Sequence, residues 1–581
     1  MNTNNMLSNE KIKEMILAAR GDLVPDLVLK NARIVNVFTN DIEPGDVAVK
    51  DGYIVGIGEY EGKDEIDIGG KVICPGLIDG HIHIESSMIS PSEFAKAVAP
   101  HGTAAVIADP HEIANVAGTD GIRFMIEASA GLPVDIFFML PSCVPATPLD
   151  ESGAELSAAE LEPFYKEDQV AGLAELMNSY GTVRADEEII RKIQGANSCG
   201  KRIDGHAPFL TGKDLNAYIT SGVGSDHECS SFEEALEKLK RGQYIMIREG
   251  TAARNLEALL PLFDDKYCDR CMLVTDDKHG NDLIDNGHID YIIRKAVKAG
   301  KNPLNAIKMA TLNTAAYFGL KNRGAIAPGY IADIIVLSDL DDFTVEKVFK
   351  NGCLTVDGGK LVREIKAPAV DKEKYSRVYK SFNLREIKPS DFEIRDEGTR
   401  KRVIKVIPGQ ILTEELIVES SSKEAETDKD IIKLAVIERH KDSGHTGVGF
   451  VTGYGLKKGA IASSVAHDSH NLIVAGCSDS DMALAANTVR ENGGGLAVVC
   501  DGEVLSSLPL PIGGLMCDMD AHEVEDILSV MKEQARQLGV NEGIDPFMTL
   551  AFTALPVIPK LRLLTQGVVD VDTQSYVPVM F

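Results

Sequence analysis

The sequence predicts an α/β protein built around a (β/α)8 barrel, with a small β-sandwich domain formed from both flanks of the barrel and a C-terminal α/β domain. Three observations predict this fold. Eight short apolar stretches alternate with helical ones in the middle of the chain, which is the pattern of a (β/α)8 barrel. Two distant segments rich in β-branched residues flank this block, and strand-like and helical stretches interleave again after it.

The length of the chain predicts several domains, because 581 residues exceed what one hydrophobic core normally holds. We assign residues 1–25 to an N-terminal helix and residues 26–70 and 325–365 to a composite small β domain. Residues 71–324 are assigned to the barrel, and residues 366–581 to the C-terminal α/β domain.

Composition and charge limit the location and the partners of the protein. The N-terminal stretch carries Glu10 and Glu14 among its apolar residues, which predicts an amphipathic helix rather than a signal peptide. No run of about twenty apolar residues occurs, so no membrane span is expected. Ten scattered cysteines are typical of a cytoplasmic protein with reduced thiols. The formal net charge of −28 opposes binding to nucleic acid or an anionic membrane, so we expect a small-molecule substrate.

The small β domain is predicted from short β-branched segments in both flanks. Before the barrel, residues 26–29 and 33–37 are strand candidates, residues 43–46 (EPGD) are a turn candidate, and strands 47–50 and 53–57 follow around the Asp51-Gly52 hairpin signal. After the barrel, a similar pattern returns at residues 332–337 and 347–351.

The barrel is predicted from eight strands with helices between most of them. The strand candidates are residues 72–84, 103–109, 134–141, 170–177, 202–207, 222–228, 244–249 and 272–276. Helices are expected, for example, at residues 231–241 and 251–263. Active sites of such barrels lie at the carboxyl ends of the strands, so polar residues at those ends are the first candidates for function.

The last part of the chain predicts a separate α/β domain. Apolar runs at residues 447–451, 460–464, 471–475 and 495–500 are strand candidates. Helices are expected at residues 479–490 and 521–538.

Six ionisable residues stand at the ends of the predicted barrel strands and indicate a metal site. In a strand, residues i and i+2 point to the same side, so both histidines of the first strand can face one metal ion. Each of the other four ends an otherwise apolar strand, where a lone ionisable side chain is costly unless it is paired or metal-bound. The six are His81 and His83 on strand one, Glu175 on four, His206 on five, His227 on six and Asp276 on eight.

Each of the six taken singly has an ordinary alternative, such as a helix start, a capped turn or an N-cap. Their combination predicts the metal. Imidazole and carboxylate ligands suit zinc, manganese or iron without selecting among them. Because six ligands are more than one ion with an open position needs, two ions bridged by Glu175 are the expected arrangement.

Several motifs resemble the amidohydrolase superfamily and, over essentially the full length, the bacterial adenine deaminases. The superfamily resemblance rests on PGLIDGHIH at residues 75–83 and GAIAPGYIAD at 324–333. The resemblance to the adenine deaminases rests on HIESS at 83–87, ADPHE at 108–112, PSCVPAT at 141–147, TDD at 275–277, FMTL at 547–550 and LPVIP at 555–559.

This resemblance implies hydrolytic deamination of adenine to hypoxanthine and ammonia, in purine salvage, by a metal-bridged hydroxide. It also implies a binuclear centre of Mn(II) or Fe(II), with zinc as an alternative. By motif, one ion would be held by His81, His83 and Asp276, and the other by His206 and His227, with Glu175 bridging them.

The expected chemistry needs proton transfer as well as a nucleophile. Two metal ions lower the pKa of a bridging water, and the resulting hydroxide attacks C6 of adenine. We expect Asp276 to accept the proton of this hydroxide and to pass it towards the leaving amine. His111 and Glu112 are the catalytic and ring-contact candidates, with a helix N-terminus as their structural alternative. Asp277 is a further substrate-site candidate that would orient a metal-bound histidine.

Three other functions can be compared with the sequence, and the second of them, the cytidine-type deaminase, is rejected. A cyclic amidohydrolase of the hydantoin or dihydroorotate type typically uses a carboxylated lysine where this chain has Glu175. A cytidine-type deaminase needs H-x-E followed by P-C-x-x-C, but Tyr267 precedes Cys268 here. A non-enzymatic scaffold would have lost metal ligands, whereas all are present. The pattern does not assign roles to His467 and His470, and a homo-oligomer, a dimer or larger, is expected.

Overall fold

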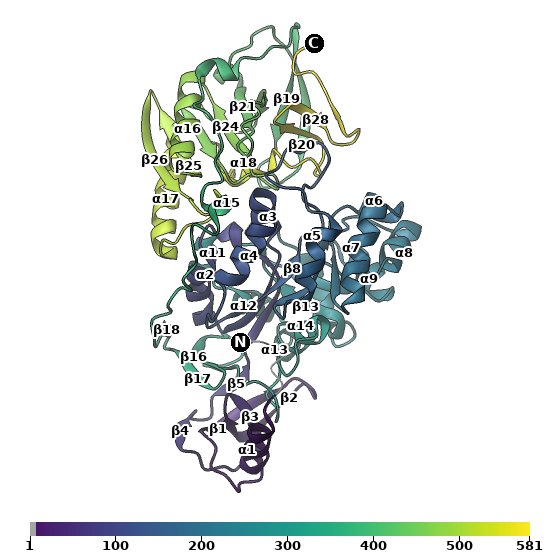
Figure 1. The fold of residues 1–581 in the computed structure, drawn as a ribbon, viewed down its shortest axis with the longest axis vertical. Helices are drawn as coiled ribbons and strands as arrows, with labels where there is room; N and C mark the ends of the chain where they lie inside the picture. The colour runs from purple at the N-terminus through teal and green to yellow at the C-terminus, as the bar shows by residue number, and fades with distance from the viewer. Residues whose placement is uncertain (1–6, 252) are drawn as a thin grey trace.

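A computed structural model describes residues 7–251 and 253–581. Figure 1 shows three parts along the long axis of the molecule: a β-sheet with helix α1 at the lower end, a barrel in the middle, and the C-terminal domain at the upper end. Among the described residues, no helix combines the length and the apolar composition that crossing a membrane requires. The expected α/β class, with a barrel and a separate C-terminal domain, is confirmed.

One nine-stranded sheet joins the two flanks of the barrel. Its order is β18-β17-β16-β15-β5-β1-β2-β3, with β4 beside β1, so strands from before and after the barrel pair directly at β5 and β15. The strands are β1 (Leu27–Asn36), β2 (Asp41–Lys50), β3 (Tyr53–Gly58), β4 (Asp64–Asp67), β5 (Val72–Pro75), β15 (Ile334–Leu337), β16 (Val345–Lys350), β17 (Cys353–Asp357) and β18 (Lys360–Leu361). Helix α1 (Asn9–Ala19) precedes the sheet and is capped by Ser8, whose side chain accepts a hydrogen bond from the backbone N–H of Lys11. Residues 1–6 of the predicted N-terminal helix lie outside the described residues.

The predicted turn at residues 43–46 is wrong. These residues lie inside β2, where Pro44 is opposite Arg33 of β1. The chain reverses earlier, between Asn36 and Asp41. The side chain of Asn36 accepts hydrogen bonds from the backbone N–H groups of Phe38 and Thr39, and Asn40 takes a left-handed φ of 59°, so these residues form the turn. The strand tolerates proline there because β3 pairs with β2 only from Asp46 onward, which leaves Pro44 on an edge.

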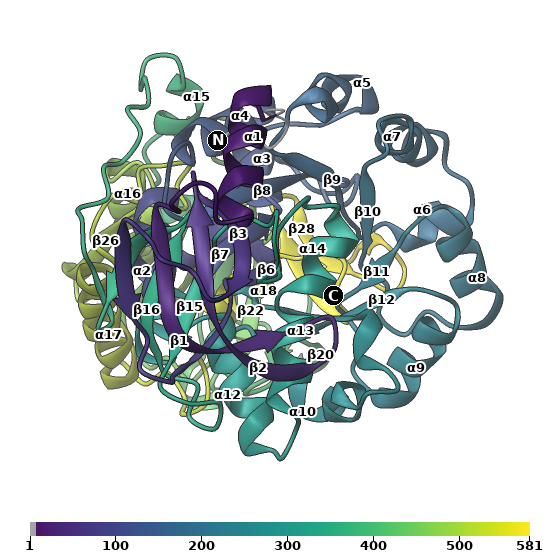
Figure 2. The same cartoon turned by 90° about the horizontal axis from the view of Figure 1, so that it is seen from below.

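The barrel contains parallel strands in chain order, as Figure 2 shows from below. One arc runs β10-β9-β8-β7-β6-β14 and the other β11-β12-β13, and a hydrogen bond of 2.9 Å from Gly224 N to Ile203 O joins them. The strands are β6 (Leu77–His83), β7 (Thr103–Ala108), β8 (Asp135–Leu140), β9 (Val170–Leu176), β10 (Arg202–Gly205), β11 (Ser225–Asp226), β12 (Tyr244–Arg248), β13 (Cys271–Val274) and β14 (Asp276–Asp277).

Two predicted barrel strands are divided in the structure. The segment predicted at residues 72–84 is β5, which belongs to the flanking sheet, followed by β6 of the barrel. Gly76 allows this change of sheet, because a Cβ atom there would lie 2.6 Å from the Cβ of Ala104. The last predicted strand bends between β13 and β14, where Asp276 takes a φ of 58°.

Helices cover the outside of the barrel. They are α2 (Pro91–Val98), α3 (His111–Ala117), α4 (Thr119–Ala128), α5 (Ala158–Leu161), α6 (Ser179–Val183), α7 (Glu187–Ser198), α8 (Gly212–Thr220), α9 (Phe232–Lys240), α10 (Leu256–Leu259), α11 (Gly280–Asp285), α12 (Ile289–Lys298), α13 (Pro303–Met309) and α14 (Leu312–Phe318). The predicted helix 231–241 corresponds to α9, which Ser231 caps. The predicted helix 251–263 begins only at Leu256; residue 252 lies outside the described residues.

The C-terminal domain contains an eight-stranded sheet in the order β20-β19-β22-β21-β24-β23-β25-β26. Its strands are β19 (Arg400–Val406), β20 (Thr413–Glu419), β21 (Ile432–Ile437), β22 (Thr446–Thr452), β23 (Ala460–Ser463), β24 (Leu472–Gly476), β25 (Gly495–Cys500) and β26 (Glu503–Pro509). Helices α15 (Ser376–Tyr379), α16 (Asp479–Glu491), α17 (Ala521–Gln537) and α18 (Met548–Phe552), and strands β27 (Leu561–Leu564), β28 (Gly567–Asp570) and β29 (Ser575–Tyr576), complete it.

The C-terminal domain contacts the barrel at the carboxyl ends of the barrel strands. Backbone hydrogen bonds connect Cys517 with Met88 and Ser90, just after β6. His445, before β22, forms a hydrogen bond of 2.8 Å with Glu151, in the long segment that follows β8. The domain therefore borders the end of the barrel where its active site is expected.

Candidate metal centre

Strand β6 positions the first two candidate ligands. His81 and His83 alternate with the buried Ile82, so both imidazoles lie on the same side of the strand. The buried carboxylate of Asp79 accepts a hydrogen bond of 3.1 Å from the backbone N–H of His81 and one of 3.2 Å from that of Thr275. Because Thr275 directly precedes Asp276, this carboxylate ties β6 to the strand that carries another candidate ligand.

Glu175, at the end of β9, lies at the centre of the group. Its Oε1 is 3.5 Å from Nε2 of His83. Its Oε2 is 2.8 Å from Nδ1 of His206 and 3.2 Å from Nε2 of His227. The two oxygens of one carboxylate therefore face two different groups of histidines, which is the arrangement that a bridging ligand requires.

Asp276 lies next to the two histidines of β6, on the neighbouring parallel strand β14. Its Oδ1 is 3.2 Å from Nε2 of His83 and 3.5 Å from Nε2 of His81. Its Oδ2 accepts a hydrogen bond of 2.6 Å from Nη1 of Arg248, at the end of β12. Arg248 also forms a two-pronged pair with Glu228, so one guanidinium fixes two carboxylates beside the histidines.

The donor set fits divalent metal ions. Two groups of three, His81 with His83 and Asp276, and His81 with Glu175 and His227, place one ligand atom of each residue within 4.8 Å of the others. Nε2 of His81 is buried and makes no hydrogen bond within the described residues. Nδ1 of His83 lies 3.1 Å from the carbonyl oxygen of Asp109, which leaves Nε2 to face the centre. Buried imidazole and carboxylate atoms of this kind are a divalent metal site.

The charges at this site depend on one another. Burial would raise the pKa of Glu175 and of Asp276, but the surrounding histidines and, for Asp276, first of all Arg248 hold both pKa values well below the usual range. Burial would lower the pKa of His227, but Glu175 and Glu228 raise it well above its usual value. Metal ions bound at this site must displace such protons, so metal binding releases protons.

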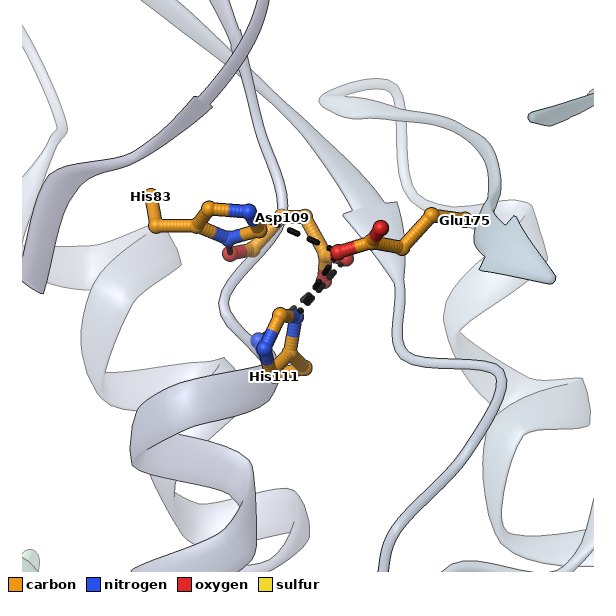
Figure 3. A group of neighbouring side chains, drawn as sticks. All are labelled: His83, Asp109, His111 and Glu175. Carbon is orange, nitrogen blue, oxygen red and sulfur yellow. Dashed lines mark hydrogen bonds and ion pairs between the residues drawn. The ribbon is translucent and has the colours of Figure 1, made fainter. Parts of the chain in front are cut away.

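His111 lies beside this group, as Figure 3 shows. Helix α3 begins at His111, and Asp109 accepts hydrogen bonds from its backbone N–H (3.1 Å) and from its Nδ1 (3.0 Å). The same Nδ1 is 3.6 Å from Oε1 of Glu175. The predicted ring-contact residue is thus adjacent to the predicted bridging ligand.

Glu112 and Asp277, the other two predicted substrate residues, have partners that the sequence did not indicate. Both oxygens of Glu112 contact histidines of the C-terminal domain: Oε1 is 2.6 Å from Nδ1 of His467, and Oε2 contacts Nε2 of His470. Burial lowers the pKa of His467, but Glu112 overrides this effect and raises it to about 9. Asp277 accepts a hydrogen bond of 2.5 Å from Ser86 Oγ, so its hydrogen bond is to a hydroxyl rather than to a metal-site histidine.

Four residues at the site were not predicted from the sequence: Asp109, Glu228, Arg248 and Asp468. Oε1 of Glu228 is 3.3 Å from Nε2 of His227, and Oδ1 of Asp468 is 4.0 Å from Nε2 of His111. Arg248 could have been predicted from the sequence, because it is a lone cation at the end of an apolar barrel strand. Asp468 comes from another domain, and sequence spacing carries no information on that contact.

Comparisons with known proteins identify the family of the chain. A model of the amidohydrolase family matches residues 72–355, and a model of the adenine deaminase C-terminal domain matches residues 410–575. The chain is 52% identical to adenine deaminase 2 of Carboxydothermus hydrogenoformans, over 98% of this chain and 99% of that protein. It is 47% identical to the adenine deaminase of Desulfatibacillum aliphaticivorans, over 97% and 99%. The chain belongs to the adenine deaminase family.

Each of the two family matches contains part of the candidate site. The amidohydrolase match contains all six predicted metal ligands, and the C-terminal match contains His467 and His470. Among solved structures, an enamidase described as a member of the amidohydrolase superfamily aligns with a TM-score of 0.46 and 19% identity, over 59% of this chain and 99% of that one.

Proposed function

We propose that the protein is an adenine deaminase, a hydrolase that converts adenine to hypoxanthine and ammonia. The observation that carries this proposal is the family relationship over nearly the whole chain. The close contacts among the six predicted metal ligands support it. Hydrolysis of adenine exchanges the amino group at C6 for oxygen, so the site needs a nucleophile, a proton acceptor and groups that hold the ring.

Two divalent ions, manganese or iron with zinc as an alternative, would be held by the six ligands. His81, His83 and Asp276 would hold one ion, His206 and His227 the other, and Glu175 would bridge them, because its oxygens face the two groups separately. When bound, such ions supply a nucleophile by lowering the pKa of a water at neutral pH.

Asp276 is the proposed proton carrier of the reaction. The guanidinium of Arg248 holds its Oδ2 at 2.6 Å, which keeps the carboxylate ionised and fixes its orientation. A fixed, ionised carboxylate beside the site can accept a proton from the attacking water and deliver it to the leaving amine.

His111, Glu112 and Asp277 are the proposed contacts to the purine. His111 and Glu112 lie at the beginning of α3 next to the metal ligands, and Asp277 directly follows Asp276 at the mouth of the barrel. The ring nitrogen N1 gains a proton as C6 becomes tetrahedral, which requires a donor on this side of the site.

The test is ammonia release from free adenine by the Mn(II)-reconstituted protein, with adenosine as the control. Rapid release from adenine alone is expected. Two bound metal ions without release from adenine would refute the proposal and direct the search to other purines, pyrimidines and cyclic amides. Absence of bound metal after reconstitution with Mn(II) or Fe(II) would favour the non-enzymatic scaffold instead.

We also expect the protein to be a homo-oligomer, and light scattering of the same sample measures its mass.

A cyclic amidohydrolase is an alternative within this superfamily that the site disfavours. Such enzymes typically use a carboxylated lysine, and the corresponding position is occupied by Glu175, which already contacts His206 and His227. Ring opening of a hydantoin or of dihydroorotate by the same preparation would favour this candidate.

A further inference from the structure

Glu112 of the barrel and two histidines of the C-terminal domain form a buried cluster at the boundary between the domains. His467 and His470 lie in the loop between β23 and β24, while Glu112 lies in the first turn of α3. The exposed fractions of the three residues are 2% for Glu112, 6% for His467 and 1% for His470. Water therefore cannot replace the contacts that these side chains make with each other.

Glu112 contacts both histidines within hydrogen-bond distance. Nδ1 of His467 is 2.6 Å from Oε1 of Glu112, and Nε2 of His470 contacts Oε2. Hydrogen bonds from an N–H group to an ionised carboxylate are stronger than those between neutral groups.

The backbone of the loop fixes which nitrogen of His470 donates. The N–H of Ala466 donates a hydrogen bond of 3.1 Å to Nδ1 of His470, so this nitrogen is an acceptor and Nε2 carries the hydrogen that faces Glu112. The backbone N–H of His470 donates in turn to Ala466 O at 2.7 Å. The buried Arg439 also donates from Nε to the carbonyl oxygen of His470.

His467 is held from a different side. Its ring stacks on Phe552 at the end of α18, with ring centroids 4.8 Å apart and an interplanar angle of 25°. The rings of both histidines are thus held by contacts inside the C-terminal domain, and one nitrogen of each faces a single side chain of the barrel, that of Glu112.

His111 lies between this cluster and the metal site. Oε1 of Glu112 is 3.5 Å from Nε2 of His111, and Nδ1 of His111 is 3.6 Å from Oε1 of Glu175. An ionised carboxylate accepts more than two hydrogen bonds, so Glu112 keeps acceptor capacity for a ligand after both histidines have donated.

We propose that His467 and His470 are positioning residues for the deamination: the C-terminal domain fixes the carboxylate of Glu112 in the orientation in which Glu112 and His111 receive the purine. This inference rests on the proposed function and assigns the C-terminal domain a part in the active site. It requires that the histidines act on the reaction only through Glu112.

The first experiment compares two kinds of substitution at each histidine. His467→Ala and His470→Ala remove the donors, and kcat/KM for adenine is expected to fall about 10- to 100-fold, the worth of a hydrogen bond to a buried charge. His467→Asn and His470→Gln place an amide N–H close to the original donor and are expected to recover most of the loss. Two metal ions per chain are expected in all four variants.

The matched control is His445→Ala. His445 also joins the C-terminal domain to the barrel through a carboxylate, that of Glu151, and within the described residues no hydrogen bond or ion pair connects it with Glu112 or a metal ligand. Its substitution tests whether weaker docking of the domain explains a loss of activity, and kcat/KM is expected to stay within about twofold of the wild type.

A double-mutant cycle decides whether the histidines act through Glu112. Glu112→Gln combined with His467→Ala is expected to lose no more activity than Glu112→Gln alone, because an interaction already removed cannot be removed twice. Fully additive losses, loss of a metal ion in the alanine variants, or an equal loss in His445→Ala would overturn the inference. Wild-type protein that releases no ammonia from adenine overturns the proposed function and this inference together, whereas wild-type turnover with unimpaired alanine variants overturns this inference alone.

Discussion

Asp276 illustrates how one residue can combine a strained backbone with a reactive side chain. Its φ of 58° lies in the left-handed region, which aspartate tolerates better than most residues but which still costs energy. The conformation bends the last barrel strand and brings the carboxylate between Arg248 and the histidines of β6. The strained position is therefore also the one at which we place proton transfer.

We predict that Asp276→Asn lowers kcat for adenine by about 10²- to 10⁴-fold, the range expected when a general base is removed. Asparagine has nearly the same shape and also adopts left-handed φ values, so the fold should persist. Steady-state kinetics and the thermal unfolding temperature measure the two effects. Near-wild-type turnover would refute the proton-transfer role, and a collapsed unfolding temperature would show that the residue is mainly structural.

We predict that Glu175→Gln loses at least one of two metal ions, because a neutral amide cannot bridge two cations as a carboxylate does. Glu228→Gln is the control: Glu228 lies 3.3 Å from His227 but is engaged by Arg248, so both ions are expected to remain. Metal analysis of the dialysed proteins provides the measurement. The reverse result, with metal lost only on substituting Glu228, would move the bridge to that residue.

At the scale of elements, the strands were predictable and their partners across the molecule were not. Apolar stretches of strand length and the polar residues at their ends are local features, so Glu175 and His206 could be found from the sequence alone. The turn expected at residues 43–46 was wrong because Pro44 lies on an edge of β2, a matter of which strand lies beside it. Contacts such as those of Glu112 with His467 join residues 355 positions apart, and no local pattern specifies them.

Strand β9 provides a test of how an element positions its ligand. A Cβ atom on Gly172 would collide with the carbonyl oxygen of Arg202 in β10 and would lie 2.7 Å from Cε of Met139 in β8. We predict that Gly172→Ala destabilises the protein by about 1–3 kcal/mol. The strand must move away from β10, so Glu175 shifts relative to His206 and metal content falls.

The control for this prediction is Gly449→Ala in β22. Its nearest neighbours would be side-chain methyl groups, with Cγ2 of Val568 at 3.1 Å and Cδ1 of Leu563 at 3.6 Å, and these can move. This variant is expected to lose less stability and to keep its metal. Wild-type metal content and unfolding temperature in Gly172→Ala would show that β9 adapts without displacing its ligand.

At the scale of the whole molecule, the barrel is joined to neighbours at both ends by buried polar contacts. The C-terminal domain contacts its upper end, and the flanking sheet contacts its lower end (Figure 1). There Lys350 and Arg323 each bind both Asp135 of β8 and Asp333, at distances of 2.6–2.8 Å. The two negative charges of the carboxylates equal the two positive charges of Lys350 and Arg323, so this buried junction carries no net charge.

This ion cluster makes the attachment of the flanking sheet depend on pH. Burial would raise the pKa of Asp135, but Lys350 and Arg323 override this effect and lower it from 3.8 to about 2. A carboxylate whose pKa is depressed in the folded state contributes stability above its unfolded pKa and loses it as the pH falls towards the folded value. The contribution of Asp135, about 2 kcal/mol, is therefore complete at pH 7 and declines between about pH 4 and pH 2.

We predict that Asp135→Asn lowers the unfolding temperature at pH 7 and that the difference from the wild type shrinks at pH 3, where the wild-type carboxylate also begins to take a proton. Thermal unfolding of both proteins at the two pH values measures this. Asp357→Asn is the control, because its pair with Lys347 is largely exposed and should contribute less than about 1 kcal/mol. An Asp135→Asn deficit of equal size at both pH values would mean that the residue stabilises the junction by packing, since a lost ionic contribution must fade as the carboxylate is protonated.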